Sequence, residues 1–142
     1  MTLDIDSFDG KDRFLSNFYP APVTYEGLRF PTVEHAFQAA KTTDVILRQV
    51  IARLPTPGLA KKHGRVLMLR AGWDNMRLDV MRMLLAQKFS DPTLRARLVA
   101  TAPAKLVEGN TWGDRFWGVC QGIGENHLGR LLMEIRDGKV TP

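Results

Sequence analysis

The stretch Asn110–Gly118 (NTWGDRFWG) concentrates more side chains suited to binding and chemistry than any other part of the sequence. It holds two of the three tryptophans, with Asp114 and Arg115 between them. Such a set suits a flat ligand that carries a sugar or a charge, because aromatic faces stack on it, charged groups bond it and glycines let the backbone approach closely. A plain Asp-Arg turn anchored by tryptophans fits the same residues equally well.

A second set of polar side chains lies on a predicted helix. Residues 33–41 have helical spacing, and Thr32 before them is the expected N-cap. Glu34, Gln38 and Lys41 stand at positions i, i+4 and i+7, so they share one face. From the pattern alone we favour a solvated stripe, because the helix dipole stabilises an acid near a helix start whatever its function.

Two loops and a basic cluster supply further candidates. Ser16 and Asn17 lie between aromatic residues that would hold their loop in place, although a turn closed by Asn17 itself is the alternative. Residues 119–126 are spaced by glycines and precede a predicted helix, whose N-terminal N–H groups could bind phosphate. The glycines also suit a plain turn. The basic residues within 61–65 are compatible with phosphate contact, with a solvated face as the simpler interpretation.

The remaining patterns predict the elements that position these residues. Helices are expected at about 32–41, 44–54, from 56 onward, 74–89, 91–100 and 126–136. Strands are expected at 3–8 and 105–108, and a hairpin at 23–30. At 142 residues the chain fits one domain with a sizeable core.

Composition narrows the class of protein. Charged residues make up 25% and hydrophobic residues 44%, which excludes disordered and fibrous chains. The single Cys120 excludes an intrachain disulfide and a cysteine-cluster zinc site, and the three histidines are too scattered for ligand spacing, so we expect no structural metal. The acidic N-terminus and the lack of a long apolar run predict neither a signal peptide nor a membrane span, and therefore a cytoplasmic protein.

Net charge of +5 makes anionic partners plausible, although a basic surface that only aids solubility is the simpler explanation. A small nucleic-acid-binding protein is thus one alternative function, supported by charge alone. Salt-sensitive binding to unmodified DNA or RNA would be its signature.

Four blocks in order resemble the YbiA-like, or NADAR (NAD- and ADP-ribose-associated), superfamily. They lie at residues 14–18, 32–41, 114–118 and 122–133. The resemblance implies a compact, mostly helical α+β domain with a few short strands, covering residues 1–142, which cleaves N-glycosidic bonds without a cofactor. Its implied substrates are ADP-ribosylated guanine in DNA or RNA, or the phosphoribosylamino-pyrimidine intermediates of riboflavin synthesis. A module that binds ADP-ribose or a nucleotide without turnover is the alternative.

Cleavage of a ribosyl C1–N bond develops positive charge on the sugar and negative charge on the leaving nitrogen, so a carboxylate is needed near C1 and a donor near the base. By matching motif positions, the resemblance assigns Glu34 and Asp114 as the catalytic acids, without saying which one activates water. It implies substrate contacts for Ser16, Asn17, Phe18, His35, Gln38, Lys41, Trp112, Arg115, Trp117, Gly118 and Asn126. The tryptophans would stack on the base or sugar, and Lys41, Arg115 and the loop 122–126 would bind phosphate. Oligomeric state and metal dependence stay open.

Overall fold

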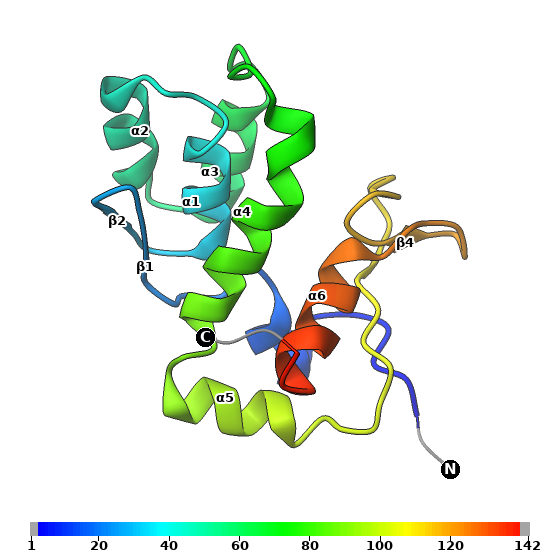
Figure 1. Cartoon of the computed structure of the whole chain (residues 1–142). Helices are drawn as coiled ribbons and strands as arrows, with labels where there is room; N and C mark the ends of the chain where they lie inside the picture. Colours follow the sequence, from blue (N-terminus) through cyan, green and yellow to red (C-terminus); the bar gives the residue numbers. More distant parts are fainter. Residues whose placement is uncertain (1–2, 140–142) are drawn as a thin grey trace. The chain divides into compact units, whose positions relative to one another are not determined.

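The computed structural model describes residues 3–139 (Figure 1). The chain divides into two compact units, and each is described here by itself. The central unit is Asn17–Lys88, and the terminal unit combines the residues up to Ser16 with those from Phe89 onward. The expectation of a single domain over residues 1–142 stays a prediction.

The central unit is a hairpin and four helices. Strands β1 (Val23–Tyr25) and β2 (Leu28–Phe30) pair antiparallel around a two-residue turn, as predicted. Both turn residues, Glu26 and Gly27, have positive φ, which matches the twist of a tight hairpin. The helices are α1 (Val33–Ala39), α2 (Val45–Ala52), α3 (Pro57–Gly64) and α4 (Trp73–Lys88).

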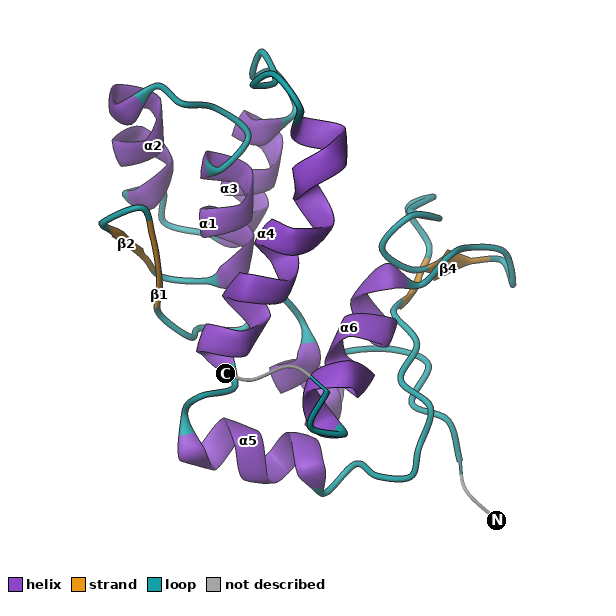
Figure 2. Ribbon diagram, in the orientation of Figure 1, coloured by secondary structure: helices purple, strands orange, loops and turns teal. Residues whose placement is uncertain are grey.

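Helix α1 is the core of this unit. Every one of its residues is buried, and it packs against α2, α3 and α4, as Figures 1 and 2 show. Side chains cap the helices at their starts: the Thr32 hydroxyl accepts from the His35 N–H, and Asp44 and Thr56 do the same for α2 and α3. The predicted start of each helix is confirmed.

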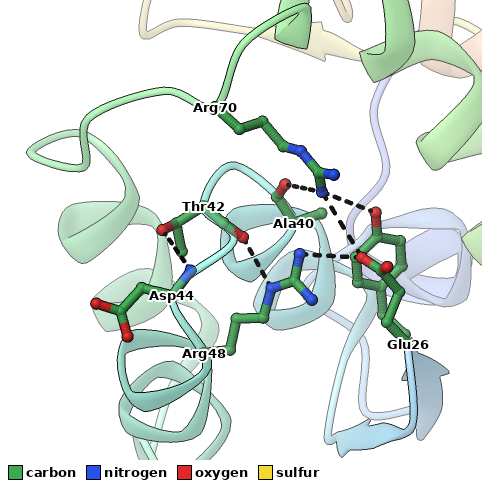
Figure 3. Close-up of polar contacts among 7 residues, drawn as sticks. Glu26, Ala40, Thr42, Asp44, Arg48 and Arg70 are labelled. Atoms are coloured by element: carbon green, nitrogen blue, oxygen red, sulfur yellow. Dashed lines mark hydrogen bonds and ion pairs between the residues drawn. The ribbon is translucent and has the colours of Figure 1, made fainter.

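A charged network fixes the C-terminal end of α1 (Figure 3). Arg48 Nη2 lies 3.0 Å from Glu26 Oε1, and Arg48 Nε donates to the Thr42 carbonyl at 2.8 Å. Arg70 Nη1 lies 3.6 Å from the same Glu26 oxygen, and the Arg70 N–H donates to the Lys41 carbonyl at 2.8 Å. The hairpin turn, α2 and the segment before α4 therefore hold the backbone around Lys41 together.

The terminal unit contains the 3₁₀ helix η1 (Gly10–Leu15), α5 (Pro92–Val99), α6 (His127–Arg136) and two short parallel strands, β3 (Gly109–Asn110) and β4 (Val119–Cys120). The starts of α5 and α6 agree with the predictions. Helices α5 and α6 pack against each other. The mostly helical α+β class with a few short strands is confirmed.

The strands predicted at 3–8 and 105–108 are wrong in extent, because they are reduced to one parallel bridge between Ile5 and Leu106. The Val107 carbonyl, which would accept from the next N–H of a longer ladder, accepts instead from the Gly109 N–H at 2.9 Å. The other edge of residues 105–108 is bonded by the Asn126 side chain. Its Nδ2 donates to the Leu106 carbonyl and its Oδ1 accepts from the Glu108 N–H, both at 3.0 Å. A side chain thus satisfies backbone groups that a neighbouring strand would otherwise bond. Within residues 3–139, no helix has the length and apolar character needed to cross a membrane.

Candidate functional site

Glu34 and Gln38 on α1 are enclosed by the central unit. Only 7% of Glu34 and 5% of Gln38 are exposed, so the solvated stripe favoured from the sequence pattern is wrong. Gln38 Nε2 donates to Glu34 Oε1 at 2.8 Å, and the Glu34 N–H donates to the Asn17 carbonyl at 3.1 Å. Because burying a carboxylate is costly unless it is hydrogen-bonded, these contacts fix Glu34 in one place.

Lys41, one turn beyond Gln38, lies among other cations. Its ammonium lies 5.9 Å from the centroid of the Phe37 ring. Burial lowers the pKa of Lys41; the Glu34 carboxylate opposes this, and the charges of Lys61, Arg65 and Arg77 lower that pKa further. Each of these four groups is therefore within electrostatic reach of Lys41. We call the cations Lys41, Lys61, Arg65 and Arg77 the Lys41 cluster. The structure brings together the acid of α1 and part of the basic stretch at 61–65.

His35 has a structural position rather than an open one. It is 1% exposed, with Nδ1 2.7 Å from the Thr32 hydroxyl and Nε2 3.0 Å from the Leu54 carbonyl. A carbonyl only accepts, so Nε2 carries the hydrogen and the Thr32 hydroxyl donates to Nδ1. Burial lowers the pKa of His35, opposed by the bond to Leu54, which fits this neutral ring. The geometry thus departs from the substrate contact expected for His35.

The loop before β1 carries Ser16, Asn17 and Phe18. Asn17 is buried in the central unit, where its Nδ2 lies 3.5 Å from Met81 Sδ, and its Oδ1 has no hydrogen-bond partner among the described residues. Phe18 is exposed. Ser16 closes η1 in the terminal unit, where its N–H donates to the Arg13 carbonyl.

Asp114 closes a tight turn in the terminal unit. Its Oδ1 accepts from the N–H groups of Phe116 at 3.1 Å and Trp117 at 2.9 Å. Asn110 holds the same residue from the other side: its Oδ1 accepts from the Asp114 N–H at 3.0 Å, and its Nδ2 donates to the Asp114 carbonyl at 2.8 Å. The turn interpretation is therefore correct for the backbone. The side chain of Trp112, however, is 60% exposed.

Residues 115–118 cap helix α6. The Arg115 carbonyl accepts from the Glu125 N–H at 2.8 Å, and the Gly118 carbonyl accepts from the Asn126 N–H at 3.2 Å. The Phe116 carbonyl accepts from the His127 N–H at 3.2 Å, and the Trp117 carbonyl accepts from the Leu128 N–H at 2.9 Å. These are the donors that a phosphate at this helix start would use. Two of these donors, Glu125 and Asn126, belong to the loop 122–126, and two belong to the start of α6. Phosphate binding by this loop stays a prediction.

The other predicted residues of this segment are placed as follows. Trp117 is half-buried, edge-on to Phe116 with ring centroids 4.9 Å apart. Arg115 is exposed, and its Nε lies 3.4 Å from the Cys120 carbonyl. Gly118 is buried, and a Cβ there would overlap Glu108 Oε2. Asn126 is buried, and both polar atoms of its side-chain amide are hydrogen-bonded to backbone groups, which assigns it a structural role.

Asn110 and Gly64 were missed as site residues. Asn110 stands four residues before Asp114 with a glycine between, a spacing that favours a side-chain-closed turn and that could have identified it. Gly64 lies at the end of α3 against Gln38, which no pattern in the sequence indicates. Among the residues that the structure describes, no three His, Cys, Asp or Glu side chains are grouped so as to hold a metal ion.

The family comparison covers both units. A model of the NADAR domain matches residues 6–138. The chain belongs to the NADAR family. The N-glycosidase YbiA of Escherichia coli (strain K12) is 45% identical over 126 residues, which cover 86% of this chain and 78% of that protein.

A solved structure of YbiA and one further relative extend this comparison. The solved NMR structure of Escherichia coli YbiA matches 96% of this chain and 85% of its own, with a TM-score of 0.83 and 41% identity. The riboflavin biosynthesis protein VVA0006 of Vibrio vulnificus (strain YJ016) is 37% identical over 133 residues, covering 91% of this chain but only 36% of that longer protein. The YbiA-like fold is thereby confirmed. Glu34 and Asp114 belong to different units, so their action as a pair stays a prediction.

Proposed function

We propose that this chain is a hydrolase that cleaves the bond between ribose C1 and a nitrogen of its substrate. The observation that carries the proposal is the Glu34 carboxylate, buried on α1, bonded by Gln38 and within electrostatic reach of Lys41. Relatives named N-glycosidases support the reaction class.

Glu34 supplies the negative charge that this reaction needs. As the C1–N bond breaks, the ribose becomes oxocarbenium-like, and a fixed carboxylate beside it stabilises that charge or takes a proton from the attacking water. Its hydrogen bond to Gln38 keeps the carboxylate oriented before the substrate arrives. Pre-orientation matters because a group that must reorganise during the reaction loses much of its catalytic effect.

Asp114 is the second acid in this proposal. The turn uses its Oδ1, so the side chain has one defined direction. The other oxygen would orient or protonate the departing nitrogen, or activate water if Glu34 acts on the leaving group. Trp117 and the exposed Trp112 are the proposed stacking surfaces for the base or sugar.

The Lys41 cluster favours a substrate that carries phosphate. Lys41 is within electrostatic reach of three other cations, Lys61, Arg65 and Arg77, and of one buried acid, so positive charge is in excess around it. A phosphoribosyl or an ADP-ribosyl group would supply the compensating anion. The relative named for riboflavin biosynthesis supports the phosphoribosylamino-pyrimidine as substrate, and DNA or RNA with ADP-ribosylated guanine is the second candidate.

Incubating the purified protein with each candidate substrate, and following the ribose-containing product by mass spectrometry, tests the proposal. We expect release of phosphoribose from the pyrimidine intermediate. Release of ADP-ribose from the modified DNA alone would keep the reaction class and reassign the substrate. Binding of both without product would instead make the chain a non-catalytic binding module.

A further inference from the structure

Two glycines of helix α3 differ in what surrounds them. A Cβ built on Gly58 finds one atom within 4 Å, the Thr56 hydroxyl at 3.9 Å, whereas a Cβ on Gly64 would overlap Gln38 Oε1 and lie 2.6 Å from its Cδ. Neither glycine has a positive φ, so the backbone does not demand glycine at either position. At position 64 the Gln38 side chain occupies the space of a Cβ, so a residue without a side chain is required there.

Gln38 has little room to move away. It is 5% exposed on a helix whose residues are all buried, and α1 packs directly against α3. A methyl group on Gly64 would also lie 3.1 Å from Gln38 Cβ, which is tighter than ordinary packing. The amide would therefore have to rotate, and rotation breaks the 2.8 Å bond from Gln38 Nε2 to Glu34.

We propose that Gly64 is a positioning residue for Glu34, because its missing side chain leaves the space from which the Gln38 amide holds that carboxylate. The inference rests on the proposed function only in that Glu34 acts on the substrate. It adds α3 to the elements that shape the site. Gly64 itself is not proposed to contact the substrate.

Gly64→Ala should therefore lower kcat about as much as Gln38→Ala does, on the order of tenfold or more, because both lose the orientation of Glu34. Gly58→Ala is the matched control, with an added methyl in the same helix, and should leave kcat unchanged. Circular dichroism and thermal melting of each variant give the folded fraction, to which kcat is normalised.

A double-mutant cycle separates positioning from simple packing. In the Gln38→Ala background the methyl on residue 64 has lost its main obstacle, so adding Gly64→Ala should recover part of the melting temperature and change kcat by less than twofold. The inference would be overturned if the kcat losses of Gln38→Ala and Gly64→Ala multiplied in the double variant. It would also be overturned if folded Gly64→Ala kept full kcat while Glu34→Gln was inactive.

The side-chain amide resonance of Gln38 gives a readout independent of activity. Gly64→Ala and Glu34→Ala should both shift this ¹⁵N–¹H signal, while Gly58→Ala should not. If Glu34→Gln retained full activity, the proposed catalytic role would fail, and the Gln38 resonance would still decide whether Gly64 positions that amide. An unshifted resonance in Gly64→Ala would contradict the inference.

Discussion

Buried ionisable side chains set the chemistry of the central unit. Glu34 is stabilised by a hydrogen bond from Gln38, whereas Lys88 at the end of α4 is 2% exposed and has its ammonium 5.7 Å from the Tyr19 ring centroid. Burial lowers the pKa of Lys88 from its ordinary 10.5 to about 7. The central unit therefore encloses an acid, Glu34, that is bonded by a donor, and an amine, Lys88, whose charged form is disfavoured by burial.

Lys88 makes stability depend on pH. Between pH 7 and 10.5 the unfolded chain holds the Lys88 proton and the native chain does not, so the free energy of unfolding should rise with pH across this window. Lys88→Met removes the cost of burying the charge and should stabilise the protein at pH 6 by on the order of 5 kcal/mol, with little effect near pH 10. Urea unfolding at several pH values measures both.

Exposed Lys105→Met is the control and should leave this pH dependence unchanged. A Lys88→Met variant that is less stable than the parent at pH 6 would show that the ammonium is compensated in the native state.

At the scale of elements, the helices were predictable and the terminal strands were not. Thr32, Asp44 and Thr56 bond to N–H groups two or three residues away, so the local sequence contains the whole signal for a helix start. Residues 105–108 instead bond to Ile5 on one edge and, on the other, to Asn126, about twenty positions along the chain. A local alternation pattern cannot report a partner that tertiary structure brings from so far away.

Asp114 closes a turn through its side chain and also has a proposed catalytic role, and two substitutions distinguish these roles. Asp114→Asn keeps an acceptor for the Phe116 and Trp117 N–H groups, so stability should change by less than about 1 kcal/mol while activity falls on the order of a hundredfold. Asp114→Ala loses the acceptor as well and should cost about 1–3 kcal/mol of stability. Unfolding curves and kcat/KM of both variants provide the test.

Asn126→Ala is a useful comparison, since it removes structural bonds of the terminal unit without removing an acid. Wild-type activity in folded Asp114→Asn would assign Asp114 to the turn alone.

For the whole molecule, each unit contains some of the residues predicted to contact substrate, and the NADAR match at 6–138 includes them all. The four sequence blocks identified the family and the acids to examine. They did not reveal that residues 115–118 cap α6, or that α3 encloses Gln38, because these contacts depend on tertiary packing. Motif spacing therefore predicted the family, whereas the contacts of each candidate residue required the structure.

The most direct test of the account is kcat/KM of Glu34→Gln, measured on the substrate that the wild-type protein cleaves. The substitution keeps the size of the buried side chain and removes its charge, and circular dichroism would confirm folding. We predict a decrease on the order of a hundredfold or more, with substrate affinity largely retained. Wild-type kcat/KM in the folded variant would contradict the central role of Glu34.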